Sequence, residues 1–166
     1  KGVLNPIYES IYAKIKLLKE IEISEEIEIS EEIKHENRCD KCKSKKTNKK
    51  WFDYKDGSVL CKKCEDKFGD EWQESVDELD DHEIKWKARL RRIYNLIDDI
   101  KEDFDKIEEI GSYNTAQTKV VRDHVANEMR DVSLALHNKT HFIEDSLQIS
   151  KKALSFCGTQ SMKDKF

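Results

Sequence analysis

The sequence predicts a mainly α-helical chain in which a small cysteine-based module is followed by a long antiparallel helical hairpin or coiled coil. Two Cys-x-x-Cys pairs, Cys39/Cys42 and Cys61/Cys64, are separated by eighteen intervening residues. Downstream of them, apolar residues recur at alternating spacings of four and three, which is typical of a helical seam. Charged residues make up 40% of the 166 residues and hydrophobic residues 37%. This composition suits long amphipathic helices better than a compact globule.

The N-terminal segment, residues 1–36, is expected to contain an amphipathic helix and an acidic linker. Asn5 and Pro6 indicate a helix start, with Asn5 as the cap and Pro6 at the first helical position. Apolar residues then follow at helical spacing, at Ile7, Ile11, Ile15, Leu18 and Ile21. The sequence Ile-Glu-Ile-Ser-Glu-Glu occurs at 21–26 and again at 27–32. Such a repeat is typical of a solvated helix face or linker, although its alternation would also suit a strand added to a partner's sheet.

The two cysteine pairs have the spacing of a closed, structural zinc site. Four thiolates at about 2.3 Å satisfy Zn²⁺ in a tetrahedron and leave no position open for water or substrate. We therefore predict one structural Zn²⁺ held by Cys39, Cys42, Cys61 and Cys64 in a finger at residues 37–68. Four unrelated reduced cysteines or redox pairs are the alternatives. Because Cys157 stands alone far downstream, no disulfide framework is expected.

The segment between the cysteine pairs predicts a short β-hairpin. Asp56-Gly57 is flanked by aromatic and aliphatic residues, and glycine adopts positive φ at little cost. Trp51 and Leu60 are expected to pack on the metal site, because a knuckle of this size has little other core. A helix is expected after Cys64.

The residues around the cysteines follow a further pattern. Thr47, Trp51 and Gly57, with Leu60 before the last cysteine pair, resemble the GATA-type zinc finger. This resemblance covers residues 37–68 and implies a treble-clef fold. The sequence departs from the family where that family contacts DNA. An arginine expected beside the tryptophan is Phe52, an Asn-Ala dipeptide is replaced by lysines, and acidic residues replace a basic tail.

The finger is basic and lies between acidic flanks. Residues 37–64 contain ten lysines and arginines and three aspartates, whereas 20–36 and 65–81 are rich in glutamate and aspartate. A GATA-like nucleic-acid-binding transcription regulator is therefore the first alternative function. Its contacts would come from Arg38, Lys43, Lys45, Lys46, Lys49, Lys50, Lys62 and Lys63. A protein partner is favoured over nucleic acid, because acidic flanks within a Debye length of about 8 Å would neutralise the positive charge of the finger.

Residues 69–158 are predicted to form the helical hairpin. The first seam comprises Trp72, Val76, Leu79, Trp86, Leu90, Ile93, Ile97, Ile100, Phe104 and Ile107. Gly111 should end the first helix and Asn114 or Thr115 should begin the second, whose stripe runs from Val121 to Cys157. Each helix would have about 40 residues, or about 60 Å. The N-terminal helix, a second copy or another subunit would cover the seam, and residues 159–166 form a tail.

A second resemblance begins at Ile143. Ala153-Leu154 leads to Gly158-Thr159, and this pattern resembles the end of the coiled coil in tripartite-motif proteins, which also place a zinc module before a coiled coil. A B-box/coiled-coil fragment of that kind is the second alternative. A B-box normally binds two metal ions; Asp53 and Asp56 could stand for its middle ligand pair, but no histidine pair follows the last cysteine.

Catalysis is not expected, because the chain contains no phosphate-cradling glycine loop and no nucleophile motif. The prediction is a nonenzymatic protein-interaction module that acts as scaffold or subunit of a larger assembly, such as one concerned with chromatin or transcription. Its partner, a protein or a second copy, would bind along the helical seams. No apolar run of about 18 residues and no signal-peptide pattern occurs, so we expect an intracellular protein with no membrane partner, either nuclear or cytoplasmic, with the nucleus slightly favoured.

Overall fold

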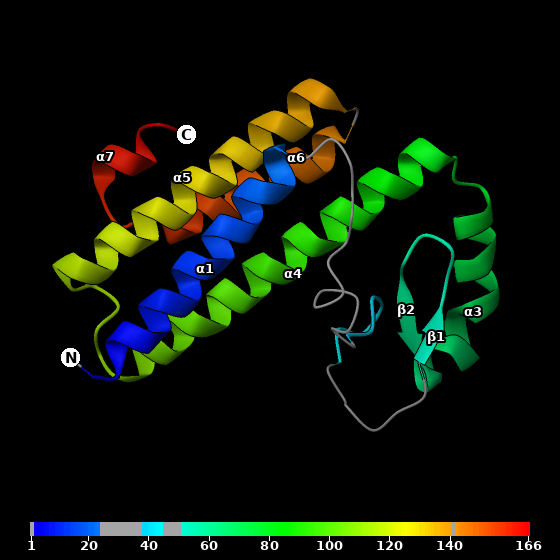
Figure 1. Cartoon of the computed structure of the whole chain (residues 1–166), viewed down its shortest axis with the longest axis horizontal. Helices are drawn as coiled ribbons and strands as arrows, with labels where there is room; N and C mark the ends of the chain where they lie inside the picture. Colours follow the sequence, from blue (N-terminus) through cyan, green and yellow to red (C-terminus); the bar gives the residue numbers. More distant parts are fainter. Residues whose placement is uncertain (1, 24–37, 45–50, 141) are drawn as a thin grey trace. The chain divides into compact units, whose positions relative to one another are not determined.

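The computed structural model of the chain describes residues 2–23, 38–44, 51–140 and 142–166, most of which are helical (Figure 1). The described residues form two compact units. Those within Glu26–Arg92 are called here the cysteine unit, and those within Lys1–Glu25 and Ile93–Phe166 the helical unit. The acidic repeat from residue 24 onward lies outside the described residues. None of the described helices combines the length and apolar character that crossing a membrane requires.

The cysteine unit contains the predicted β-hairpin. Strand β1 (Trp51–Asp53) pairs antiparallel with β2 (Val59–Cys61), and Trp51 lies opposite Cys61. Gly57 in the turn has φ +83°, a conformation that glycine adopts without strain. The Gly57 N–H donates to the carbonyl of Tyr54 at 2.9 Å. The hairpin prediction at Asp56-Gly57 is therefore confirmed.

Helix α3 (Lys62–Asp77) follows β2 directly and completes the core of the cysteine unit. Leu60 is fully buried and Trp51 packs against the same cluster, as the sequence predicts. Trp72 and Val76 also belong to this cluster, instead of opening the long seam of a helical hairpin. The Trp72 indole N–H donates to Ser58 Oγ at 2.9 Å, which fixes α3 to the hairpin turn.

The helical unit is built from four main helices. They are α1 (Leu4–Ile23), the part of α4 (Asp81–Glu109) from Ile93 onward, α5 (Ala116–Lys139) and α6 (Ile143–Phe156); the short α7 (Gln160–Lys163) follows (Figure 1). Helix α5 packs against both α1 and α6. Lys14 on α1 forms an ion pair with Asp103 on α4 at 2.6 Å. The core side chains include Ile11, Leu18, Ile97, Ile100, Phe104, Ile107, Val125, Met129, Leu136 and Ile149.

The prediction of two helices of about 40 residues is corrected, because each is divided into two. Helix α3 ends at Asp77 and α4 begins at Asp81. Asp80 caps α4, since its Oδ1 accepts the N–H of Glu83 at 2.8 Å. Asp80 and Glu83 have the spacing of a capping pattern, which competes with the apolar period at this point.

The second division lies between α5 and α6. Thr140 ends α5: its N–H donates to the carbonyl of Leu136 at 3.1 Å, and its Oγ1 accepts the N–H of Phe142 at 3.1 Å. Helix α6 then returns along α5. Ser133 on α5 forms hydrogen bonds with Ser146 at 3.0 Å and Ser150 at 2.7 Å. These small side chains let the two helices approach closely, so α5 and α6 form a hairpin of their own.

The remaining helix ends follow the predicted signals closely. Gly111, at φ +73°, ends the turn after α4, and Thr115 caps α5 by accepting the N–H of Thr118. Helix α1 begins at Leu4, so Asn5 and Pro6 lie inside its first turn, and Asn5 is not the predicted cap. Where the predicted tail begins, the Gly158 N–H and the Thr159 hydroxyl donate to the carboxylate of Asp123 at 2.7 and 2.8 Å. This arrangement explains the Gly-Thr dipeptide as the link into α7.

Candidate metal centre

The four cysteine side chains of the two Cys-x-x-Cys pairs come together in the cysteine unit. The Sγ atoms of Cys39, Cys42, Cys61 and Cys64 all lie within 4.8 Å of one another. Cys42 Sγ and Cys61 Sγ are 3.8 Å apart, and a tetrahedron with metal–sulfur bonds of about 2.3 Å has an edge of about 3.8 Å. Cys42 is exposed and the other three are buried. The cluster therefore has the size and the donor atoms of a four-cysteine metal site.

Local backbone structure places the first pair. Cys39 and Cys42 lie in a tight turn in which the N–H of Lys43 donates to the carbonyl of Cys39 at 2.8 Å. The Cys39 N–H in turn donates to the carbonyl of Ser44 at 3.0 Å. Lys43 adopts φ +62°, and it is the one described non-glycine residue with positive φ. A non-glycine residue pays a steric cost there, so this turn is held in place by the contacts around it.

The second pair lies where β2 meets α3. Cys61 ends the strand and occupies the N-cap position of α3, and Cys64 lies in the first turn of that helix. Backbone N–H groups and the positive end of the helix dipole favour negative charge at this end of a helix. The strand-to-helix junction thus places two sulfur atoms at the N-terminal end of α3.

The cysteines differ in their acid–base behaviour. Burial opposes ionisation of Cys39, but hydrogen bonds from the backbone at Cys42, Cys61 and Lys41 outweigh it and lower the Cys39 pKa to about 7. Burial, together with hydrogen bonds to the other three cysteine side chains, raises the pKa of Cys64 to about 12. A divalent cation among the sulfur atoms would replace the remaining thiol protons, so metal binding at this cluster releases protons.

The donor set fits zinc. Thiolates are soft ligands that favour Zn²⁺ or iron–sulfur centres, and a tetrahedral arrangement of four sulfurs is common to both. Spacings of two residues within each pair match structural zinc sites. Each cysteine can contribute one ligand atom. With four thiolates bound, zinc has no open coordination position.

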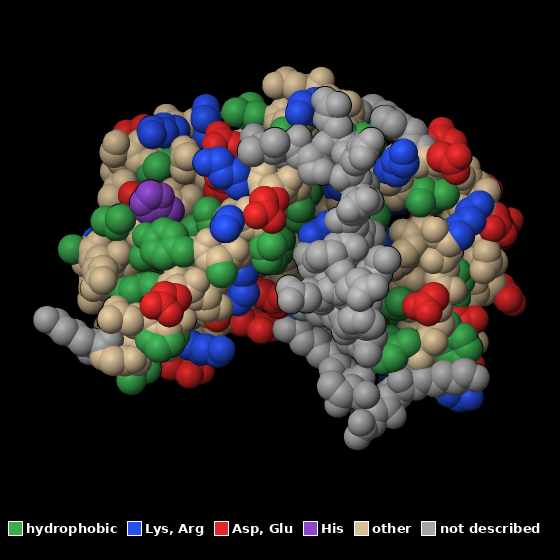
Figure 2. All heavy atoms as spheres, viewed as in Figure 1, with side chains coloured by type: hydrophobic (Ala, Val, Ile, Leu, Met, Phe, Trp, Pro, Cys, Tyr) green, Lys and Arg blue, Asp and Glu red, His purple; other side chains and the backbone are tan. Residues whose placement is uncertain are grey.

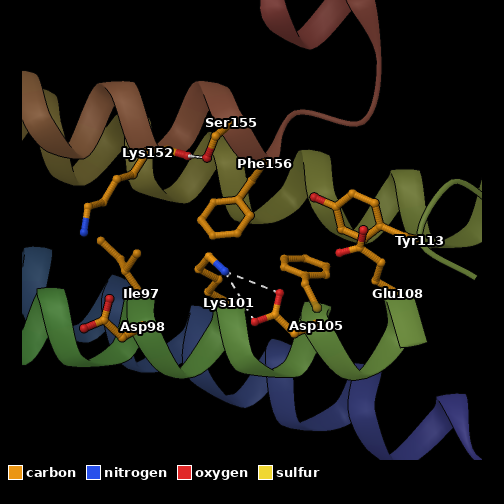
Figure 3. A pocket seen from close by; sticks show the side chains of 10 residues that line it. Ile97, Asp98, Lys101, Asp105, Glu108, Tyr113, Lys152, Ser155 and Phe156 are labelled. Carbon is orange, nitrogen blue, oxygen red and sulfur yellow. Dashed lines mark hydrogen bonds and ion pairs between the residues drawn. The ribbon is translucent and has the colours of Figure 1, made fainter. Parts of the chain in front are cut away.

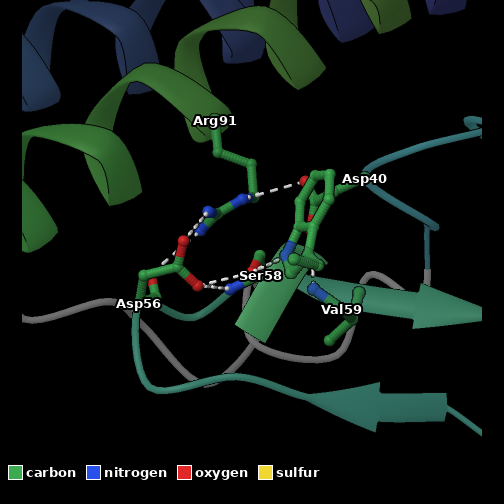
Figure 4. A network of polar contacts seen from close by, with 6 residues as sticks. Asp40, Asp56, Ser58, Val59 and Arg91 are labelled. Atoms are coloured by element: carbon green, nitrogen blue, oxygen red, sulfur yellow. Dashed lines mark hydrogen bonds and ion pairs between the residues drawn. The ribbon is translucent and has the colours of Figure 1, made fainter. Parts of the chain in front are cut away.

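A charged network joins Arg91 to Asp40 and Asp56 near the candidate metal site (Figure 4). Arg91 on α4 forms an ion pair through Nε with Asp40 Oδ1 at 2.9 Å, and Asp40 stands between the first two cysteines. The Arg91 guanidinium also pairs with Asp56 Oδ2 at 3.5 Å and donates to the Asp56 carbonyl at 3.2 Å. Arg91 therefore joins the first cysteine turn to the hairpin turn.

Both aspartates of this network have further hydrogen bonds. Asp40 Oδ2 accepts the N–H of Val59 at 2.7 Å, and Asp56 Oδ1 accepts the N–H of Ser58 at 2.8 Å. Burial raises the pKa of Asp40, whereas the positive charge of Arg91 opposes that rise. Asp56 is engaged with Arg91 and Asp53 is exposed. Within the described ranges, the group of side chains that could hold a metal ion consists of the four cysteines and includes neither Asp53 nor Asp56.

The predicted nucleic-acid contacts fall into three groups. Lys43, Lys62 and Lys63 are exposed, whereas Arg38 is 5% exposed and is not presented to solvent. The other four residues, Lys45, Lys46, Lys49 and Lys50, lie outside the described residues. Sequence reasoning missed the network of Asp40, Asp56 and Arg91. The sequence signals this network only by an aspartate, Asp40, inside the first Cys-x-x-Cys pair. Nothing in the sequence connects Asp40 to Arg91.

The chain matches no family model, no curated protein and no solved structure.

Proposed function

We propose that the chain is a nonenzymatic interaction module whose four-cysteine cluster binds one structural Zn²⁺. The observation that carries the metal assignment is the convergence of four sulfur atoms within 4.8 Å. Four thiolate ligands fill the tetrahedral coordination of zinc, so the ion would stabilise the fold and have no position for substrate. Its binding free energy would contribute directly to folding of the cysteine unit.

Exposed apolar side chains support the interaction role. Ile143, Leu147 and Leu154 are spaced four and seven residues apart, so they share one face of α6. Their exposures are 49%, 54% and 42%. Apolar side chains grouped on one exposed face commonly mark protein–protein contacts. A partner protein or a second copy of the chain would bury this face, and the chain would serve as scaffold or subunit of a larger assembly.

Charge near the cysteine cluster also favours a protein partner over nucleic acid. Lys62 and Lys63 are exposed at the start of α3, but exposed acidic residues follow on the same helix. They are Asp66, Asp70, Glu71, Glu74 and Asp77. Phosphate contacts dominate nonspecific affinity for nucleic acids, and carboxylates repel phosphates. The GATA-like and tripartite-motif-like alternatives remain predictions from the sequence.

Native mass spectrometry of the purified chain tests both parts of this proposal, because it measures metal content and subunit number together. We expect one zinc ion per chain, in a dimer or a larger species. Leu147→Glu places a charge in the exposed α6 face and should shift the population to monomers without loss of zinc. A wild-type chain that is a strict monomer and binds no partner would contradict the interaction role, and a folded chain without zinc would contradict the metal assignment.

A further inference from the structure

A pocket of about 430 Å³ lies between α4 and α6, wholly within the helical unit (Figure 3). Its floor is apolar and consists of Ile97, Phe104 and Phe156, which are buried. Tyr113 forms one end. The ring centroids of Phe104 and Phe156 are 5.4 Å apart, and those of Phe104 and Tyr113 are 6.0 Å apart at 83°. A volume above about 300 Å³ is sufficient for a ligand or several side-chain atoms.

The rim of the pocket is charged. Asp98, Asp105 and Glu108 come from α4, together with Lys101, and α6 contributes Lys152. Carboxylates therefore outnumber ammonium groups. Both ammonium groups have contacts within the chain: Lys101 Nζ lies 3.3 Å from Asp105 Oδ2, and Lys152 Nζ lies 5.3 Å from the centroid of the Tyr94 ring. The balance of charge on the rim favours a positively charged ligand.

An aromatic floor and an acidic rim suit a long basic side chain. The methylene stem of lysine or arginine packs on apolar surface while its charged end stays near water or carboxylates. The faces of aromatic rings also attract cations. The helical unit already contains such a contact, since the Arg122 guanidinium lies 4.1 Å from the centroid of the Tyr113 ring.

We propose that this pocket binds a lysine or arginine side chain of a partner protein. The stem would lie over Phe104 and Phe156, and the charged end would meet the carboxylate of Glu108. That the partner is a protein rests on the proposed interaction role; the preference for a basic side chain rests on the pocket alone. The metal centre belongs to the other unit and contributes no residue here.

The test is a titration of the metal-loaded full chain with capped amino acids, followed by nuclear magnetic resonance. The probes are N-acetyl-lysine and N-acetyl-arginine methylamides, with the norleucine and glutamate derivatives for comparison. We expect saturable shifts at Lys101, Phe104, Tyr113 and Phe156 for the basic probes. The norleucine probe, which has a similar stem without charge, should bind at least about fivefold more weakly. Equal binding of the lysine and norleucine probes, or preferred binding of the glutamate probe, would overturn the proposal.

Two neighbouring glutamates provide a matched pair of variants. Glu108 lines the pocket, whereas Glu109 is exposed and does not. Glu108→Lys should weaken the basic probes at least about tenfold, and Glu109→Lys should leave them unchanged. Ser155→Trp, which fills the pocket from α6, should also abolish the shifts. Equal effects of the two charge reversals, or no saturable shift in the folded wild type, would refute the site. Zinc content, measured separately, decides the metal assignment independently.

Discussion

At the scale of single residues, Arg91 has the clearest structural role outside the cysteines. Its side chain is 19% exposed and pairs with two buried carboxylates, those of Asp40 and Asp56. A buried carboxylate that loses its partner keeps its desolvation cost and gains no attraction in return. Arg91 therefore determines whether the cysteine turn and the hairpin turn stay together.

Arg91→Met should lower the free energy of unfolding of the cysteine unit by about 3 kcal/mol. Urea unfolding followed by tryptophan fluorescence measures this unit selectively, because all three tryptophans lie between residues 51 and 86. Zinc should also transfer faster to a chelator. Lys87→Met, on the same helix at an exposed position, is the control. Equal losses in the two variants would show that the ion pairs contribute nothing specific.

The Tyr94 hydroxyl should make the free energy of unfolding of the helical unit depend on pH in the alkaline range. This hydroxyl donates to Asp145 at 2.7 Å, and burial, with the hydrogen bond to Asp145, raises the pKa of Tyr94. Because the folded-state pKa exceeds the unfolded value of about 10, the unfolded chain releases this proton first. The stabilisation is complete below about pH 10 and is lost as the pH rises through the folded-state pKa.

Tyr94→Phe should therefore lose less stability than the wild type as the pH rises above about 10. The measurement is urea unfolding followed by circular dichroism at 222 nm at several pH values. Tyr12→Phe, at an exposed position on α1, controls for loss of a tyrosine hydroxyl. If Tyr94→Phe and the wild type keep parallel slopes above pH 10, the hydrogen bond to Asp145 does not affect titration of Tyr94.

At the scale of secondary-structure elements, the four-cysteine cluster joins a turn, a strand and a helix around a small core. Cys61→Ser should unfold the cysteine unit, because structural zinc contributes on the order of 10 kcal/mol to folding of small zinc modules. The helical unit should retain its helices, since its core comes from α1, α4, α5 and α6. Tryptophan emission should shift to the red while much of the helical circular dichroism persists.

Cys157→Ala is the matched control for the cysteine variant. Cys157 is buried in the helical unit and does not belong to the four-cysteine cluster. This variant should keep its zinc and its tryptophan emission. A Cys61→Ser chain that stays folded and free of metal in the cysteine unit would contradict the account of zinc as a folding cofactor.

Local signals in the sequence predict some elements well and others poorly. Asp56-Gly57 predicts the hairpin and Gly111 predicts the end of α4, because each position needs a backbone conformation that glycine adopts easily. The apolar spacing does not predict the helix break at Thr140. Leu136 and Ile143 are seven residues apart, so the apolar period continues across a turn that reverses the chain. Tertiary packing between the serines of α5 and α6 decides that turn.

At the scale of the whole molecule, each of the two units has a core of its own. The sequence predicts the cysteine cluster because ligand spacing is a local property of the chain. It does not predict Arg91 as the partner of Asp56, which lies 35 residues away, or the pocket between α4 and α6. Both depend on which helix faces are brought together. Composition and the spacing of apolar residues restrict the fold class, but they do not determine which residues of different elements contact one another.

The central claim is that four thiolates of one chain bind one zinc ion. X-ray absorption at the zinc edge, recorded on the purified full chain, measures the donor atoms and their distances directly. We expect four sulfur atoms at about 2.3 Å and no oxygen or nitrogen in the first coordination sphere. Zinc bound by oxygen or nitrogen at about 2.0 Å, or the absence of zinc from the folded chain, would contradict the claim.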